Sequence, residues 1–348
     1  MTDLRPQIAV VGAGIRGSMF GAAIDQHPRA RLAALCDSCS DVVARVADQL
    51  RVPAYADLAG LLAAHPAVTA AVIATPDDAH LDAAITCLEA GLDLLIEKPL
   101  ATSNDDAIAI CETAERNGRA VAVGFENRWN PRFTVVQQAL ASGRHGRVVN
   151  QVVSLNDTIF VPTQMLSWAA RSSPAWFLMP HSLDLAIWLS HTTPVSVFAR
   201  GVRKVLTGRG VDTWDAISAI FEMSDGAMLV LNSSWVLSEA APSVFDFRYE
   251  VQTELSTFKL DIADSGVVQH SSDGAHFLQS GVHHHRDQTR GIPIDMVNDW
   301  VDKLNGDDVA LPDARHGALV TRAIEAVHTS LDTGQPVAID ETHTRSKP

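Results

Sequence analysis

Short apolar runs alternate with longer amphipathic stretches along the first third of the chain. The runs are apolar at nearly every position, as in strands that a sheet buries on both faces. Apolar residues recur at helical spacing in the stretches between them. The pattern predicts strands at 7–11, 31–36, 70–75, 92–97 and 120–125, and helices at 14–26, 41–50, 57–64, 78–90 and 103–116. Strands separated by helices of this length predict an α/β fold with a parallel, doubly wound sheet.

After about residue 125 the pattern changes to strand-like alternation. Strands are expected at 147–155, 195–203, 213–222, 227–235, 244–253 and 256–262, and helices at 131–142, 181–190 and 315–332. Hairpin-like turns such as 224–226 indicate one large, mainly antiparallel sheet. We therefore expect two domains, 1–124 and 125–348, and a frayed tail at 344–348.

Composition narrows the classes of function. Two domains agree with the length of 348 residues, and 41 acidic against 27 basic residues leave a net charge of −14. That charge disfavours nucleic acid and anionic membranes as partners. No apolar stretch has the length of a membrane span and no secretory leader is visible, so we expect a cytoplasmic protein. Four cysteines, with Cys36 and Cys39 lacking a second pair, predict neither a disulfide framework nor a zinc site.

A glycine motif follows the first predicted strand and opens the first helix. It reads Gly12-Ala13-Gly14-Ile15-Arg16-Gly17. In this context the pattern is typical of a dinucleotide-binding turn, where the backbone approaches a pyrophosphate at a helix N-terminus. Asp37 ends the second strand, where a carboxylate accepts hydrogen bonds from ribose hydroxyls. With Ser38 beside it and no nearby basic residue to hold a 2′-phosphate, we expect NAD rather than NADP.

Further motifs follow at the ends of later strands and at one helix start. They are Ala74-Thr75-Pro76-Asp77-Asp78-Ala79-His80, Glu97-Lys98-Pro99, Asn127-Arg128-Trp129-Asn130-Pro131, Ser142-Gly143-Arg144-His145-Gly146 and the segment His181–Leu189. In this order the chain resembles the glucose–fructose oxidoreductase, inositol dehydrogenase and rhizopine-catabolism (Gfo/Idh/MocA) family over almost its whole length.

The resemblance implies an N-terminal Rossmann domain that binds NAD and a C-terminal α/β domain with a large open sheet for substrate binding and oligomerisation. It also implies NAD(P)-dependent dehydrogenation of a CH–OH group in a sugar, cyclitol or related polyol, by a homodimer or homotetramer assembled through that sheet. One position departs from inositol dehydrogenases. They carry an Asp four residues before the helix-opening His181, and this chain has Phe177 there.

Oxidation of a secondary alcohol needs a base and a donor that stabilises developing alkoxide. Lys98, at the carboxyl end of a parallel strand, and His181, at a helix start, are the predicted catalytic residues. Asp184, one turn after His181, is expected to be structural.

Other candidates follow from position in the fold. The expected cofactor contacts, besides the glycine turn, Asp37 and Ser38, are Thr75, Pro76, Asp77, His80, Glu97 and Lys98. The expected substrate contacts are Asn127, Arg128, Trp129, Asn156, Asp157 and Trp176. A loop position for Asp77 and His80, a salt bridge for Arg128 and core packing for Trp176 stay open as alternatives. Three histidines at 283–285 are expected in a solvated or substrate-covering loop, and no metal site is predicted.

Three functions compete at this point. The leading one is an NAD-dependent dehydrogenase of a sugar, glycoside or cyclitol, with substituted sugars favoured by Trp176 and Phe177 beside His181. The second is an NAD-dependent glycosidase that uses transient oxidation and elimination, as some members of the family do. The third is a regulator that senses NAD without turnover, against which the presence of both Lys98 and His181 argues.

Overall fold

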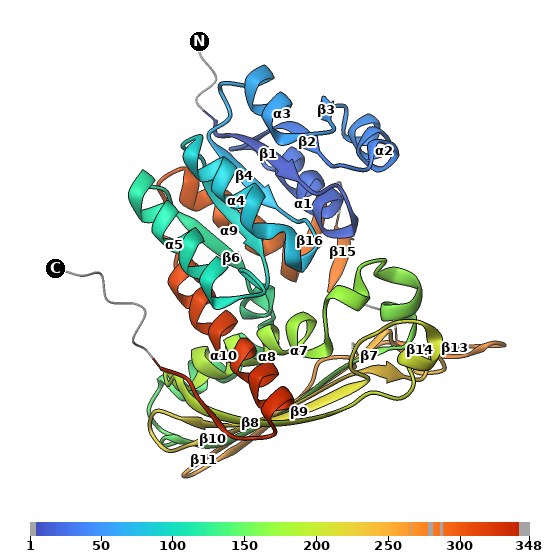
Figure 1. Ribbon diagram of the computed structural model, residues 1–348, viewed down its shortest axis with the longest axis vertical. Helices are drawn as coiled ribbons and strands as arrows, with labels where there is room; N and C mark the ends of the chain where they lie inside the picture. The colour runs from blue at the N-terminus through green and yellow to red at the C-terminus, as the bar shows by residue number, and fades with distance from the viewer. Residues whose placement is uncertain (1–4, 265, 278–280, 286–287, 341–348) are drawn as a thin grey trace. The chain divides into compact units, whose positions relative to one another are not determined.

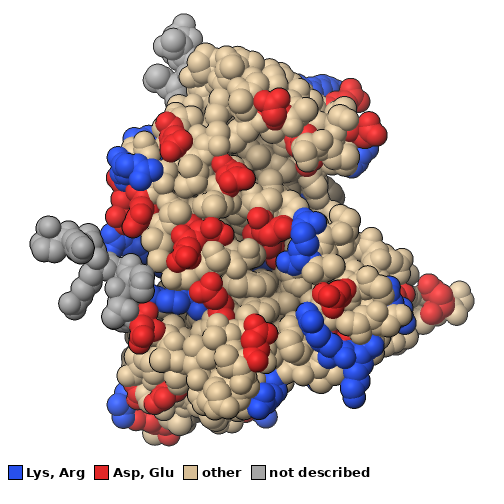
Figure 2. All heavy atoms as spheres, in the orientation of Figure 1, with Lys and Arg blue, Asp and Glu red and all other residues tan. Residues whose placement is uncertain are grey.

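The chain forms two compact units in a computed structural model that describes residues 5–264, 266–277, 281–285 and 288–340. The first unit combines residues 1–129 with 280–321, and the second combines 130–279 with 322–348. The predicted tail at 344–348 lies outside the described residues. Acidic side chains, red in Figure 2, are spread over the visible face and alternate with groups of basic side chains, drawn in blue.

The first unit is built on a six-stranded parallel sheet (Figure 1). Its strands are β1 (Gln7–Val11), β2 (Arg31–Cys36), β3 (Ala54–Tyr55), β4 (Ala70–Ile73), β5 (Asp93–Glu97) and β6 (Val121–Gly124). They lie in the order β3-β2-β1-β4-β5-β6. Strands β1 to β3 are added toward one edge of the sheet and strands β4 to β6 toward the opposite edge, so the order of addition reverses between β1 and β4. Ligands of such sheets bind at the carboxyl ends of the strands beside this reversal. The predicted doubly wound sheet is confirmed.

Local signals explain where the helices of this unit begin and end. They are α1 (Ile15–Gln26), α2 (Ser40–Leu50), α3 (Leu58–Ala64), α4 (His80–Glu89) and α5 (Asn104–Asn117), with short 3₁₀ turns η1 (Asp77–Ala79) and η2 (Glu126–Trp129). The side chains of Asp57 and Ser103 accept N–H bonds in the first turns of α3 and α5, and Gly118 ends α5 in the left-handed region. Where a single helix was predicted at 78–90, the structure has the 3₁₀ turn η1 followed by the helix α4.

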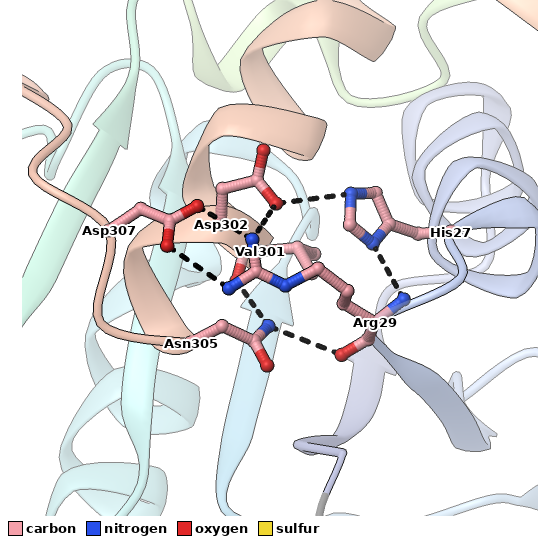
Figure 3. Close-up of polar contacts among 6 residues, drawn as sticks. All are labelled: His27, Arg29, Val301, Asp302, Asn305 and Asp307. Atoms are coloured by element: carbon pink, nitrogen blue, oxygen red, sulfur yellow. Dashed lines mark hydrogen bonds and ion pairs between the residues drawn. The ribbon is translucent and has the colours of Figure 1, made fainter.

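A later helix, α9 (Ile292–Leu304), completes the core of the first unit. Its buried face, including Val297 and Trp300, packs in one hydrophobic cluster with residues of β1 and α1. At its end, Arg29 lies 3.1 Å from Asp302 and 2.6 Å from Asp307, within the group His27, Arg29, Val301, Asp302, Asn305 and Asp307 of Figure 3. The sequence assigned all of 125–348 to one domain, whereas these contacts place 280–321 in the first unit.

The second unit is built on a seven-stranded mixed sheet in the order β12-β11-β7-β10-β9-β8-β17. The strands are β7 (Val148–Thr158), β8 (Pro194–Val202), β9 (Ala216–Met223), β10 (Met228–Leu237), β11 (Phe245–Thr253), β12 (Thr257–Asp261) and β17 (Val337–Ala338). β7 and β10 pair in parallel and the other neighbours are antiparallel. The predicted large, mainly antiparallel sheet is confirmed.

Helices cover one face of this sheet. They are α6 (Pro131–Ala141), α7 (Pro174–Phe177), α8 (Met179–Ser190) and the second half of α10 (Ala314–Thr333), with short turns η3 (Val161–Met165), η4 (Ala169–Arg171) and η5 (Thr207–Arg209). The side chains of Trp235 and Phe221 are fully buried on the helix-covered face. Neighbouring positions on the opposite face, such as Ile220, are exposed. The alternation expected of a sheet covered on one face is therefore present.

Two small ribbons lie outside the main sheets. β13 (Val268–Ser271) pairs with β14 (Gly274–Phe277), and β15 (Val282–His285) pairs with β16 (Gln288–Gly291). The histidines at 283–285 were expected in a loop. They form an exposed strand instead, because residues 282–285 pair in register with 288–291.

Candidate active site

The glycine turn is closely packed at Gly12 and Gly17 and open at Gly14. Gly12 has φ +92°, and a Cβ there would lie 2.5 Å from the carbonyl oxygen of Ala74. A Cβ at Gly17 would lie 1.7 Å from the carbonyl oxygen of Gly12. Gly14 is exposed and a Cβ there would meet nothing within 4 Å. The turn is therefore tight where strand and helix pack, and open at the N-terminus of α1, as a pyrophosphate requires.

Asp37 lies just after β2 and faces the same turn. Its Oδ2 accepts the N–H of Ala13 at 2.7 Å, and its Oδ1 accepts the N–H of Cys39 at 2.8 Å. Each carboxylate oxygen keeps a second lone pair, which a ribose hydroxyl can use. The half-buried carboxylate and exposed Ser38 bring no positive charge to this position. The residues present fit NAD, which would lie with its pyrophosphate at Gly14 and its ribose at Asp37.

His80 connects the loops that follow β4 and β5. Its side chain is 1% exposed, with Nδ1 2.8 Å from the carbonyl oxygen of Pro99 and Nε2 3.1 Å from that of Thr75. The Thr75 hydroxyl donates to the carbonyl oxygen of Ala79. His80 is therefore an internal link between two predicted cofactor loops, rather than a surface loop residue.

Lys98 follows the last residue of β5 at the carboxyl edge of the sheet. It is 6% exposed, and its backbone N–H donates to Oε2 of Glu97 at 3.0 Å. Glu97 is also buried, and its Oε1 lies 3.0 Å from Nε of Arg16 in the glycine turn. The structure thus brings the predicted catalytic lysine, Glu97 and the predicted cofactor turn together within the first unit.

Glu126 is a member of this group that the sequence analysis missed. It begins η2, after the carboxyl end of β6, and its carboxylate pairs with Arg16. Burial raises the pKa of Glu126, and the neighbouring charge of Glu97 adds to the rise, while Arg16 opposes it. The sequence signal that could have identified Glu126 is its place directly after a predicted strand, because residues that follow parallel strands lie together at one edge of the sheet.

The next residues of η2 have partners in the first unit. Nη2 of Arg128 lies 2.9 Å from Nε2 of His316, and Nε1 of Trp129 donates to Asp299 at 2.7 Å. Trp129 also packs against the core that α9 completes. These contacts orient both side chains toward α9 and α10, and the predicted substrate role of Asn127, Arg128 and Trp129 stays a prediction.

In the second unit, His181 lies in the first turn of α8 and is half-buried. α7 ends at Phe177, and a single residue, Leu178, separates it from the start of α8. The ring of Phe177 packs against those of Trp168 and Trp235, with centroids 5.9 and 5.7 Å apart. An aromatic cluster therefore occupies the position where the family resemblance implies a carboxylate in inositol dehydrogenases.

Trp176 has a packing role. It is 9% exposed and its indole stacks on the imidazole of His328 in α10, with centroids 5.3 Å apart and planes 13° from parallel. Ser173 accepts the N–H of Trp176 and lies 3.0 Å from Nε2 of His328. Burial lowers the pKa of His328 to about 4, so this ring is neutral at pH 7. This packing agrees with the alternative of core packing, and the substrate contact of Trp176 stays a prediction.

Asn156 and Asp157 lie on opposite faces of β7, because successive residues of a strand alternate. The Asn156 side chain bonds to the hydroxyls of Ser154 and Ser234, on the face away from Trp235. Asp157 is buried on the other face. The two side chains therefore point to opposite faces of the sheet, and their substrate role stays a prediction.

The described residues contain no group of three or more His, Cys, Asp or Glu side chains placed to hold a metal ion. All four cysteines are free thiols, and Cys36 is buried while Cys39 is exposed. No helix among the described residues has the length and apolar character needed to cross a membrane.

Comparison with known proteins identifies the family of both units. The family described as "Oxidoreductase family, NAD-binding Rossmann fold" matches residues 7–125, and the GFO/IDH/MocA C-terminal domain matches residues 133–259. An inositol 2-dehydrogenase from Rubrobacter xylanophilus is 26% identical over 339 residues, which cover 97% of this chain and 94% of that protein.

Solved structures share the fold over both units. Myo-inositol 2-dehydrogenase from Lactobacillus plantarum has a TM-score of 0.82 at 16% identity, covering 97% of this chain and 100% of that one. Scyllo-inositol dehydrogenase from Lactobacillus casei, solved with NAD(H) and scyllo-inositol, has a TM-score of 0.79 at 16% identity, covering 96% and 99%. The chain belongs to the Gfo/Idh/MocA family of NAD-dependent oxidoreductases.

Proposed function

We propose that this protein transfers a hydride between NAD and a secondary hydroxyl or carbonyl of a sugar, glycoside or cyclitol. The observation that carries the proposal is the buried Lys98 at the carboxyl edge of the sheet, linked through Glu97 to the glycine turn. Relatives named inositol 2-dehydrogenase support the same class of reaction. When bound, NAD supplies the hydride acceptor.

Two side chains of the chain supply the acid–base chemistry in this proposal. Lys98 donates a hydrogen bond to the reacting oxygen and stabilises its developing negative charge. His181, in the first turn of α8, accepts the hydroxyl proton. In the reverse direction the same groups return the proton to the carbonyl oxygen.

Phe177 points to a substrate with an apolar or substituted part. Its ring packs on Trp168 and on the buried Trp235, so an apolar side chain lies near the start of α8, where the family resemblance implies a carboxylate in inositol dehydrogenases. Aromatic rings suit the C–H face of a sugar ring or an aglycone better than a bare ring of hydroxyls. We therefore place a glycoside or substituted sugar ahead of inositol as the substrate.

A panel of cyclitols, free sugars and glycosides tests the proposal, with NADH formation as the readout. We expect turnover with at least one member, and a fall of ~10²–10⁴-fold in Lys98→Met with NAD binding retained. Near-normal turnover in Lys98→Met would remove Lys98 from the chemistry. Glycoside cleavage with retained NAD and no net NADH would favour the glycosidase. NAD binding without turnover of any compound would favour the regulator.

We also propose that the protein assembles as a homodimer or homotetramer through the open face of the seven-stranded sheet. On that face Val152, Val230, Ile220 and Phe198 form a row across β7, β10, β9 and β8, since each is paired with the next in register. Ile220 is 47% exposed and Val152 is 37% exposed. A continuous apolar row on an exposed sheet is typical of a surface that a second copy covers.

A further inference from the structure

Arg16 occupies an unusual place, in the glycine turn but facing two carboxylates. Its Nε lies 3.0 Å from Oε1 of Glu97, and its Nη2 pairs with Oε2 of Glu126. The guanidinium also lies over the ring of Phe20, 5.6 Å from its centroid. Three elements meet at this one side chain: the start of α1, the end of β5 and the start of η2.

The contact continues from Glu97 to the backbone of Lys98. Oε1 of Glu97 faces Arg16, while Oε2 accepts the N–H of Lys98 at 3.0 Å. Oε2 is thus hydrogen-bonded to the Lys98 backbone, while Oε1 has an ion pair with Arg16 but no hydrogen bond among the described residues. A guanidinium paired with two carboxylates has little freedom to rotate. The contacts from Glu126 through Arg16 and Glu97 therefore reach the Lys98 backbone.

Charge explains why a cation is needed at this position. The side chains of Glu97 and Glu126 are 7% and 17% exposed, and two carboxylates so little exposed would repel each other without a positive partner. Their charges raise the pKa of the Arg16 guanidinium against the opposing effect of burial. Because the Arg16 guanidinium pairs with both carboxylates, we expect it to contact them rather than a phosphate of the cofactor.

We propose that Arg16 is a positioning residue for Lys98, tying the catalytic lysine to the glycine turn that binds NAD. This inference rests on the proposed function, in which Lys98 contacts the reacting oxygen. Its consequence is that the NAD site and the acid–base site share one rigid connection, so that loss of the Arg16 contacts misplaces Lys98 even when NAD still binds.

The experiment compares Arg16→Gln, Arg16→Lys and Glu126→Gln, with Arg315→Gln as the control. Arg315 pairs with Glu115 at 2.6 Å on the exposed surface of the same unit, so its loss removes an ion pair without touching Lys98. We expect Arg16→Gln to lower kcat ~10–100-fold, the range for a small misplacement of a reacting group, while the Kd for NAD changes less than ~3-fold. Arg16→Lys should recover part of the loss, and Arg315→Gln should match wild type.

A second readout does not depend on turnover. The sequence has five lysines, so side-chain NMR of protein with labelled lysine gives few signals, and Lys98→Met identifies that of Lys98. We expect the Lys98 signal to move in Arg16→Gln and Glu126→Gln, and to stay in Arg315→Gln. Thermal unfolding of each variant checks that it is folded.

The outcomes separate this inference from the proposed function. A Lys98 signal and a kcat that are both unchanged in folded Arg16→Gln and Glu126→Gln would overturn the positioning role. A Kd for NAD that rises in parallel with the loss of kcat would also overturn it, because Arg16 would then be a cofactor ligand. If wild-type protein turns over no polyol, the proposed function fails, while movement of the Lys98 signal still supports the connection through Arg16.

Discussion

The carboxylate of Asp37 shows how one residue combines structural and binding roles. It accepts two backbone N–H bonds, from Ala13 in the glycine turn and from Cys39 after β2. These bonds hold a negative charge where the adenosine ribose of a dinucleotide lies in such sheets. A 2′-phosphate at that point would meet like charge, while a ribose diol would donate to the free lone pairs.

Replacing Asp37 should therefore change cofactor preference. We expect wild type to bind NAD at least ~10-fold more tightly than NADP, a difference of about 1.4 kcal/mol for each factor of ten. Asp37→Ser should narrow this gap, mainly by weakening NAD. Asp37→Asn is the matched control, because its amide oxygen can still accept the N–H of Ala13 without a charge. Fluorescence titration measures both constants, and tighter NADP binding by wild type would refute the assignment.

His181 is the second residue whose role can be measured directly. With Phe177 in the aromatic cluster, the carboxylate that accompanies this histidine in inositol dehydrogenases is replaced by an apolar ring. If His181 accepts the proton, His181→Asn should lower kcat/KM ~10²–10⁴-fold and remove the acidic limb of its pH profile. An unchanged profile with only a higher KM would give His181 a substrate-binding role and leave Lys98 as the acid–base group.

At the scale of elements, α7 and α10 meet through a neutral histidine. His328 of α10 stacks on Trp176 of α7, and its Nε2 lies at the Ser173 hydroxyl that caps α7. Because burial is the main cause of its low pKa, with Arg203 adding to it and Asp332 opposing, protonation is unfavourable only while the unit is folded. The packing of α7, which leads into α8, is thus linked to pH.

The direction of this pH dependence follows from the pKa of His328 in the unfolded and in the folded chain. The ordinary His value is 6.5 and the folded value is about 4, so His328 lowers stability as the pH falls from about 6.5 to about 4. The loss approaches about 3 kcal/mol at the lower limit. Thermal unfolding at pH 7 and pH 5 measures it. His328→Phe, which keeps an aromatic stack without a titratable group, should show a smaller decrease, and an equal decrease would assign the effect to other groups.

The elements differ in how far sequence could predict them. Most strands and helices of residues 5–129 were predictable from their own hydrophobic periodicity and capping residues, such as Ser103 and Gly118 of α5. The short strand β3 and the helix α9 were not among the predicted elements. The assignment of α9 to the first unit depends on contacts with Arg29 and the α1 core, which no local pattern reveals. Residues 282–285 form the strand β15 through their pairing with β16. The opposite faces of Asn156 and Asp157, in contrast, follow from strand geometry and were predictable.

The candidate site was predictable to a similar degree. Gly12, Asp37 and Lys98 could be found because strand ends and glycine turns have fixed places in a doubly wound sheet. Residues that act through others were harder to find. Glu126 and His328 contact partners that lie more than 100 residues away along the chain, Arg16 and Ser173 respectively, and their roles depend on these contacts. Sequence spacing alone does not bring such pairs together.

At the scale of the whole molecule, the open face of the seven-stranded sheet is the surface that we propose for contact with a second copy. The apolar row from Val152 to Phe198 crosses four neighbouring strands at one level of the sheet. Around it lie polar side chains, including Asn232 and Ser218, which bond to each other at 2.7 Å. An apolar centre with a polar rim is the usual composition of a specific protein interface.

A charge at the centre of that row should separate the copies. Ile220→Asp places a carboxylate among Val230 and Phe198, where burial against a second copy would leave it unpaired at a cost of several kcal/mol. We expect light scattering after size exclusion to show an oligomer for wild type and a smaller species for Ile220→Asp. Leu255→Asp is the control, since Leu255 is 74% exposed at the turn between β11 and β12. If Ile220→Asp keeps the wild-type mass while Leu255→Asp reduces it, assembly uses another surface.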